Sequence, residues 1–515
     1  MKRRILPMIM VITIIMSVIQ VPAWAATGDD PAGEDGNPGQ VSEQPIEEST
    51  EPSAPVEEEK LASSVTNSLS DGETEEEATP KEPADNVAEV NGKGYPTLQE
   101  AITAAKGAEI TLLADVKGQE RVNIDDGETV TIDLNNYDVT FAANEQNVYN
   151  SFYVTHGTLN LLGTGRVSEQ EGGEFYAPVL VEGATNDQKD YSVVNVGEGV
   201  TLQGWAGIMI DYNSAMTAYG VVVNVDGTLC SVRDASDSGG HALYINGSIA
   251  ATEGNIPQII LDGATLTTEQ GNGMYLAGYA ETSIRNSTIT SSSEGSTGIE
   301  IRAGKLTITD STVTGGTGKF EAIPNGNGST TANVALAVVQ HTTKLPLEVT
   351  INSGEFTGGA ALFQQNVQKN EDEAVATIKL DVRDGNFVGQ VYSENVENFI
   401  SGGTFSNTEN FTSENYLTDS VKLENNKVTP LGPTDEASVA QVGSTYYKSL
   451  SAAIAAAGDG DTVTLLKDNE TTDTIVVREN LTLDLHGCTL TLSQPQSKEP
   501  QFVVSSTGDL TIRDT

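Results

Sequence analysis

Acidic residues recur where short apolar runs end in tight turns, and acids so placed could support two kinds of chemistry. Four aspartates follow such runs: Asp226, Asp262, Asp310 and Asp384. Arg285 and Arg383 stand just before equivalent turns. Eliminating a proton from an acidic sugar requires carboxylates that hold Ca²⁺ and a basic residue nearby. We favour a simpler interpretation, in which these aspartates, with Asn286 and Ser353 in the same column, stabilise turns by hydrogen bonds. The two arginines are then expected to pair with surface acids.

Hydrolysis of a glycosidic bond instead needs two carboxyl groups roughly 5–10 Å apart. Asp211, Glu300 and Asp381 are scattered along the sequence, and no local pattern marks them as a pair. The four histidines are His156, His241, His341 and His486. Their spacing does not match a metal site, so each is expected to be a surface or turn residue. The sequence therefore assigns no catalytic residue, no metal ligand and no cofactor, and Ca²⁺ has no support.

Aromatic residues gather in the middle of the chain and are the candidate ligand-binding residues. They are Trp205, Tyr212, Tyr219, Tyr244 and Tyr275. Flat rings with polar edges could form a strip on which sugars stack. The alternative, which we favour, is that these rings pack against loops or fill the core. This group is nevertheless the first place to look for a ligand.

Short strands that recur along the chain must position all of these side chains. A β-branched run, a small or polar turn and an apolar residue follow one another repeatedly, as in VNVDGTL (223–229) and TINSGEF (350–356). The apolar residues before the turns are Val196, Val225, Leu261, Ile284, Ile308, Ile351, Val382 and Ile400. Their spacing is too irregular for the blades of a propeller, and the longest gap is expected to hold a loop around Glu321–Thr331.

Such strands predict an all-β solenoid in which successive turns of a parallel β-helix stack. Alternating side chains send every second residue inward, so the central Ile and Val residues should form apolar ladders along the axis. A β-sandwich is the alternative architecture, but it does not explain so many copies of one strand-turn-strand phrase.

A second, longer repeat covers a predicted helix and the strands after it. Residues Ala88–Asp115 are repeated at Ala440–Asp468, and the match continues into the following strands. Within Thr97–Lys106, the residues Leu98, Ala101, Ile102 and Ala105 share one helix face, and Thr97 with Glu100 fits a capping box. We expect this helix to cap the open end of the coil, and Ser449–Ala457 to cap a second coil that is truncated at Thr515.

The ends and the composition predict export. A basic start, an apolar stretch and Ala23-Trp24-Ala25 form a secretory signal at 1–25. Residues 26–87 read as a disordered acidic linker, 88–431 as a β-helix, 432–438 as a linker and 439–515 as the start of a second β-helix. The net charge of −46 argues against binding nucleic acid. Cys230 and Cys488 cannot form a disulfide framework.

The run from Val439 through Val477, with NLTLDLHGCTLTL after it, resembles the opening of pectin-lyase-like right-handed β-helix domains in exported proteins of Gram-positive, often gut-dwelling, bacteria. The phrase FISGGTFSNTENFTSENYLTD (399–419) resembles their closing phrase. The resemblance covers 87–431 and 437–515. It implies a right-handed parallel β-helix in a cell-wall or adhesin protein, and it specifies the fold better than any activity.

These observations together favour a non-catalytic module of the cell surface that functions in adhesion or in glycan or mucin binding. Host or cell-wall glycans are the expected partners, with no nucleic acid and no membrane after signal cleavage, and the chain would be one monomeric unit of a longer tandem protein. The alternative is a polysaccharide lyase or glycoside hydrolase of the β-helix type.

Overall fold

The computed structural model describes residues 86–143, 149–169, 177–183, 191–211, 219–232, 240–247, 249, 256–324, 328–472, 474–493 and 502–515. The expected signal peptide and the expected linker up to residue 85 lie outside these ranges. In the part of the chain that is described, no helix is both long and apolar enough to cross a bilayer.

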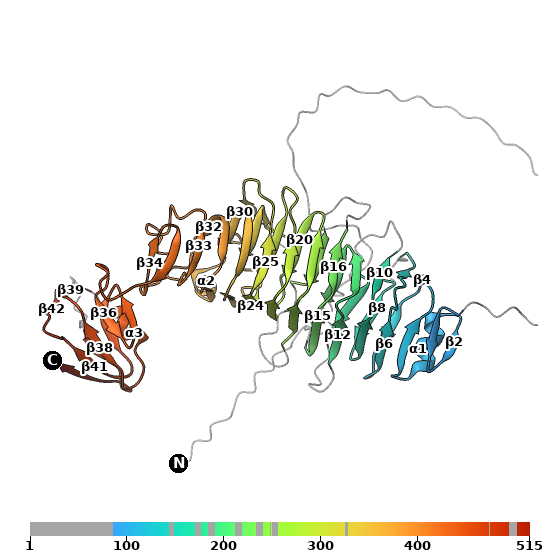
Figure 1. Ribbon diagram of the computed structural model, residues 1–515, viewed down its shortest axis with the longest axis horizontal. Coiled ribbons are helices and arrows are strands. Elements are labelled where there is room, and N and C mark those ends of the chain that lie inside the picture. The colour runs from blue at the N-terminus through green and yellow to red at the C-terminus, as the bar shows by residue number, and fades with distance from the viewer. Residues whose placement is uncertain are drawn as a thin grey trace, which may run out of the picture.

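The first series of strands forms a 12-stranded sheet along one side of an elongated coil (Figure 1). Its order is β2 (Lys93–Tyr95), β1 (Ala88–Val90), β3 (Glu109–Leu112), β6 (Thr129–Asp133), β9 (Thr158–Leu162), β12 (Ser192–Val196), β15 (Val221–Val225), β18 (Gln258–Asp262), β21 (Glu281–Arg285), β24 (Gly304–Thr309), β29 (Leu347–Ile351) and β31 (Ile378–Val382). From β3 onward the neighbouring strands are parallel.

The second and third series belong to one 21-stranded sheet. The second series is β4 (Val116–Gln119), β7 (Val139–Phe141), β10 (Gly165–Glu169), β13 (Val200–Gly204), β16 (Thr228–Ser231), β19 (Thr265–Thr268), β22 (Thr288–Thr290), β25 (Ser311–Thr314), β30 (Gly354–Gln364), β32 (Asn386–Ser393) and β33 (Gly403–Phe405). The third series is β5 (Val122–Ile124), β8 (Phe152–Thr155), β11 (Val179–Glu182), β14 (Ala206–Asp211), β17 (Gly240–Ile245), β20 (Gly271–Leu276), β23 (Thr297–Ile301) and β28 (Val334–Val338), continued by the long strands β30 and β32. Up to β28, each turn of the coil takes one strand from each series, as in β9, β10 and β11, whereas β30 and β32 each serve the second and third series together.

The register confirms the predicted apolar ladder. The eight residues predicted to precede the turns pair one with the next along the first series, in the order Val196, Val225, Leu261, Ile284, Ile308, Ile351, Val382 and Ile400. All eight are buried in one apolar cluster that fills the coil. Because parallel strands stack at every step, the architecture is an all-β parallel solenoid, and the alternative of a β-sandwich is wrong.

Helix α1 (Leu98–Ala105) lies where the sequence predicts it. The Thr97 hydroxyl accepts a hydrogen bond from the Glu100 amide at 3.2 Å, and the helix buries the predicted face, Leu98, Ala101, Ile102 and Ala105. These four residues belong to the same apolar cluster as the coil. A short second helix, α2 (Asp372–Val375), interrupts the coil between β30 and β31.

Two hairpins are added to the coil. The predicted loop around Glu321–Thr331 contains β26 (Glu321–Ala322) and β27 (Thr331–Ala332), which pair antiparallel. Near the end of the coil, β34 (Val421–Glu424) and β35 (Lys427–Pro430) also pair antiparallel. Inside that end, Phe356, Phe387 and Phe405 stack with centroids 4.9 and 4.8 Å apart.

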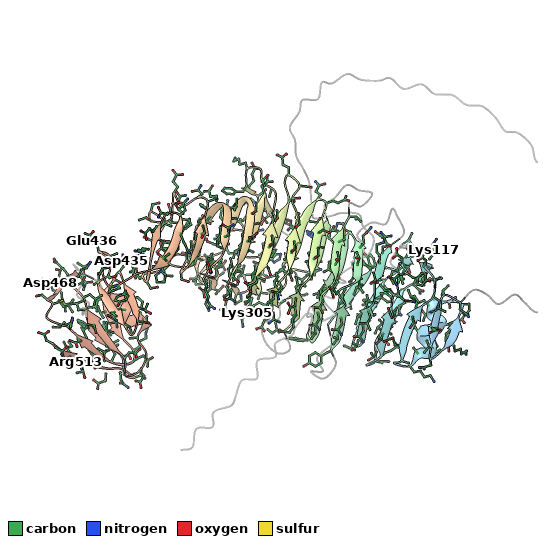
Figure 2. The ribbon with its side chains drawn as sticks, in the orientation of Figure 1. Lys117, Lys305, Asp435, Glu436, Asp468 and Arg513 are labelled. Carbon is green, nitrogen blue, oxygen red and sulfur yellow. The ribbon has the colours of Figure 1, made fainter. Side chains whose placement is uncertain are left out.

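Residues from Val439 onward pack around a separate apolar cluster. This second unit holds α3 (Leu450–Ala456) and the sheet β37 (Thr445–Tyr447), β36 (Ala440–Val442), β38 (Thr462–Leu465), β41 (Asn480–Asp484) and β44 (Asp509–Arg513). Two further parallel pairs are β39 (Asn469–Thr471) with β42 (Leu490–Leu492), and β40 (Ile475–Val477) with β43 (Phe502–Val504). Asp435 and Glu436 lie beside this unit (Figure 2).

Candidate functional site

Side-chain hydrogen bonds join some of the acidic turns of the first series in pairs. Asp262 accepts from the Asn286 amide at 2.8 Å, and Asp310 accepts from the Ser353 hydroxyl at 2.6 Å. Asn286 and Asp310 have positive φ angles of 49° and 48°, a conformation that Asn and Asp tolerate better than most residues. The interpretation of these aspartates as turn residues is therefore supported for Asp262 and Asp310. Within the described residues, no group of three His, Cys, Asp or Glu side chains could hold a metal ion.

The other candidate residues at these turns make different contacts. The two arginines pair with surface acids as predicted, Arg285 with Asp262 at 3.5 Å and Arg383 with Asp381 at 2.7 Å. Asp384 accepts from the amide of Gly385. For Asp226, the backbone amide bonds the carbonyl of Val196. Several of these turns line an open groove of about 430 Å³, formed by Asp310, Ser311, Thr312, Ser353, Gly354, Glu355, Asp384, Gly385 and Asn386.

A pair of carboxylates stands on the outer face of the third series. Val181 and Ile210 point into the core, so the residues after them, Glu182 and Asp211, point outward. The two acids are direct partners in the register of β11 and β14, and neighbouring strands lie about 4.8 Å apart. On the next turn, the Asn246 amide donates to Asp211 at 3.1 Å. We call Glu182, Asp211 and Asn246 the carboxylate row.

Two tyrosines and an arginine surround the start of this row. The hydroxyl of Tyr153, on β8, donates to Glu182. Arg121 lies 4.7 Å from the Tyr153 ring and donates from Nε to the Tyr149 carbonyl at 2.8 Å. Burial raises the pKa of Glu182, although the Tyr153 hydrogen bond and Arg121 oppose that rise. Burial also raises the pKa of Tyr149 and of Tyr153, so both phenols stay protonated at neutral pH.

Aromatic rings continue along the same face, and we call Trp205, His241, Tyr244 and Tyr275 the aromatic row. His241 stacks on Tyr244 and Tyr275 with centroids 5.5 and 5.0 Å apart, and the Trp205 ring meets His241 edge-on at 5.1 Å. Trp205 and Tyr275 are buried, whereas Tyr244 is partly exposed. The structure thus brings together three of the five predicted aromatic residues. Tyr219 precedes β15 of the first series, and Tyr212 lies outside the described residues.

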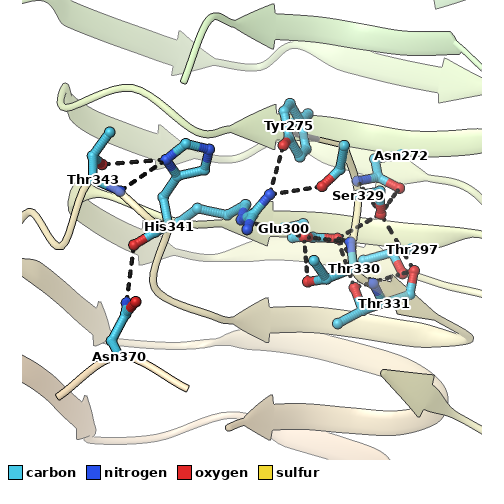
Figure 3. Close-up of polar contacts among 12 residues, drawn as sticks. Asn272, Tyr275, Thr297, Glu300, Ser329, Thr330, Thr331, His341, Thr343 and Asn370 are labelled. Atoms are coloured by element: carbon cyan, nitrogen blue, oxygen red, sulfur yellow. Dashed lines mark hydrogen bonds and ion pairs between the residues drawn. The ribbon is translucent and has the colours of Figure 1, made fainter. Parts of the chain in front are cut away.

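A buried ion pair follows the aromatic row at the β26–β27 hairpin, and Figure 3 shows the contacts of its Glu300 with Ser329, Thr330 and Thr331. Glu300 and Arg302 are both fully buried, with Arg302 Nε 3.9 Å from the Glu300 carboxylate. The carboxylate mainly accepts from the hairpin, namely from the hydroxyls of Ser329, Thr330 and Thr331 and from two backbone amides. Arg302 Nη1 donates to the Tyr275 hydroxyl at 2.9 Å and to the Gly328 carbonyl at 2.6 Å. Glu300 therefore anchors the hairpin to the coil.

Two of the histidine predictions are wrong. His241 and His341 are both buried, and His241 lies among the rings of Trp205, Tyr244 and Tyr275. Burial lowers the pKa of His241 to about 3 and that of His341 to about 4, with Arg302 adding to the effect on His341. His156 and His486 have positive φ angles of 63° and 49° and do stand at turns.

The chain matches no family model, no curated protein and no solved structure. Its function must be inferred from the residues themselves.

Sequence reasoning missed Glu182, although a signal for it is present. The third series repeats a phrase in which two apolar residues flank an outward one and a polar residue follows: VLVE (179–182), IMID (208–211), LYIN (243–246) and IEIR (299–302). Aligning these phrases places Glu182 beside Asp211. The first-series turn phrase is more regular, and it directed attention to the acids of the first series.

Proposed function

We propose that this chain is a non-catalytic, secreted or cell-wall-associated module that binds a glycan along the outer face of its third series. The observation that carries the proposal is the in-register placement of the carboxylate row beside Tyr153 and Tyr244. Carboxylate and amide oxygens accept hydrogen bonds from sugar hydroxyls, and the partly exposed Tyr244 ring offers apolar surface to the C–H groups of a pyranose.

The regular coil suits this role because it holds the outward side chains of successive turns in register. A linear polysaccharide repeats, so one chain could contact several turns at once and gain from multivalent contact. We further propose a right-handed coil that α1 caps, a secretory leader at 1–25, and tandem units of a pectin-lyase-like surface protein. The resemblance of the opening and closing phrases supports this part of the proposal.

Binding of the full chain to a panel of oligosaccharides tests the proposal. Asp211→Asn and Tyr244→Ala should each weaken binding at least tenfold, which corresponds to about 1.4 kcal/mol. Trp205→Ala and Tyr212→Ala test two further aromatic candidates. Asp384→Asn removes an acid from the groove of the first series and should leave the affinity unchanged. A chain that binds no glycan, or whose binding is unaffected by Asp211→Asn and Tyr244→Ala, would contradict the proposal.

A second candidate function is glycoside hydrolysis, and the Glu182–Asp211 pair favours it. A carboxyl group whose pKa is raised by burial can act as a general acid beside a second carboxylate. Side chains from adjacent strands fall near the separation of about 5–5.5 Å that retaining enzymes use. This function predicts release of reducing ends from the panel and its loss in Glu182→Gln with binding retained. No release after prolonged incubation would exclude it.

A further inference from the structure

We infer that the carboxylate row selects uncharged or amine-bearing sugars and rejects sugars that carry carboxylate or sulfate groups. The inference rests on the proposed glycan-binding function and names the class of glycan for the same face. It concerns the third series from β8 to β17, where Glu182, Asp211 and Asn246 follow one another on successive turns.

The negative charge already present makes a further anion costly at this place. Glu182 is partly buried, and burial raises its pKa, which means that even its own charge is poorly solvated. Asp211 is its direct neighbour in register and adds a second carboxylate. The effect of Asp211 extends to both tyrosines, since its charge helps to raise the pKa of Tyr149 and of Tyr153. A uronate or sulfate would therefore face like charges at short range.

Among the described residues, Arg121 is the basic residue beside the row, and it is already engaged. Arg121 donates from Nε to the Tyr149 carbonyl and lies over the Tyr153 ring. Its positive charge lowers the pKa of Glu182, so it already compensates that carboxylate. Recognition of a sugar acid typically uses the paired donors of a guanidinium, and here the geometry commits one edge of Arg121 to the protein itself.

Neutral and amine-bearing sugars fit the same groups well. Sugar hydroxyls are donors, and a carboxylate acceptor gives each of them a charge-assisted hydrogen bond. The ammonium group of a hexosamine would pair with Asp211 and Glu182 directly. The net charge of −46 over the whole chain acts in the same sense, because it lowers the local concentration of polyanions and attracts cations.

The test compares tetrasaccharides of the gluco, galacto and manno configurations, each in a neutral, a 6-carboxylate and a 2-amino form. Calorimetry with the full chain at low salt should give at least tenfold weaker binding for the carboxylate form of the sugar that binds best, and tighter binding for its amino form. Both differences should shrink in high salt, because the interaction is electrostatic. They should also shrink in Asp211→Asn and persist in the control variant Asp384→Asn.

The possible outcomes distinguish the inferred selectivity from the proposed glycan-binding function. If a carboxylate form binds as tightly as its neutral counterpart, or more tightly, the selectivity is wrong while glycan binding stands. If no form of any sugar binds, the proposed function fails and this inference fails with it. If the preference exists but Asp211→Asn leaves it unchanged, the carboxylate row is not its source and the inference is overturned.

Discussion

At the scale of residues, the outer face of the third series places polar groups where water is largely excluded. His241 lies among three aromatic rings, and Glu300 and Arg302 lie under a hairpin. Burying an ion pair seldom adds stability by itself, but removing one partner leaves a buried charge that costs about 3–5 kcal/mol. Glu300 and Arg302 therefore fix the position of the hairpin on the coil.

Acid should destabilise the coil through His241. Its pKa is about 3 in the folded chain against 6.5 in the unfolded chain, so the unfolded state binds more protons between these values. The free energy of unfolding then falls as the pH decreases from 6.5 toward 3, by at most about 1.4 kcal/mol per pH unit. His241→Phe keeps the ring contacts and removes the proton site. Denaturant unfolding measures the decrease in the free energy of unfolding between pH 6.5 and pH 4.5. This decrease should be smaller in His241→Phe than in the unaltered chain by about 2–3 kcal/mol.

An equal loss of stability at low pH in His241→Phe and in the unaltered chain would show that other groups, such as the surface carboxylates, govern the response to acid.

At the scale of elements, each strand is stabilised by its neighbours in the ladder more than by its own turn. The first-series ladder consists of aliphatic residues, whereas the last turns of the second series carry a stack of phenylalanines. Offset or stacked rings add about 0.5–1.5 kcal/mol beyond the area that they bury. The stack therefore contributes to closing the coil at the turns before the β34–β35 hairpin.

Phe387→Ala should destabilise these turns by about 3–5 kcal/mol, because it leaves a cavity between Phe356 and Phe405. Its neighbour Val388 is 43% exposed and points the other way, so Val388→Ala should change the free energy of unfolding by less than about 0.5 kcal/mol. Thermal or denaturant unfolding monitored by circular dichroism provides the measurement. Equal effects of the two substitutions would mean that the stack does not hold these turns.

At the scale of the whole molecule, the two units meet through a small set of polar contacts. The Lys448 amide donates to the Asp419 carbonyl at 2.8 Å, and its Nζ donates to the Thr418 carbonyl at 3.2 Å. Ser449, the N-cap of α3, bonds the Asp419 carboxylate at 3.2 Å. Before α1, the position that corresponds to Lys448 is Pro96, which has neither a backbone N–H nor an amino group to donate. The contact is thus specific to the second unit.

Lys448→Ala should loosen this joint, since it removes one hydrogen bond and the aliphatic stem of a half-buried side chain, worth about 1 kcal/mol. X-ray scattering of the full chain should then show a broader distribution of interatomic distances, with the secondary structure unchanged. Lys117→Ala, at the far end of the coil (Figure 2), should have no effect. An unchanged scattering curve in Lys448→Ala would show that the joint is held by other contacts.

The sequence by itself determined the ladder of the first series, the helix before it and the turn residues. Each of the eight ladder residues from Val196 to Ile400 stands in a local pattern that predicts an inward side chain followed by a turn. Thr97 likewise predicts the start of the helix, because its hydroxyl can cap it. These features depend on neighbours in the sequence, which is why they can be read without the fold.

Only the tertiary structure decided which outward side chains meet. Glu182 and Asp211 become neighbours because one full turn of the coil returns the chain to the same position, and the length of that turn depends on loops that vary from turn to turn. The surroundings of Glu300 and His241 also depend on the tertiary structure. Hairpin residues far from Glu300 in the sequence donate hydrogen bonds to it, and side chains from neighbouring turns bury His241. Local sequence patterns thus predict the coil, whereas the register between turns decides which outward side chains become neighbours.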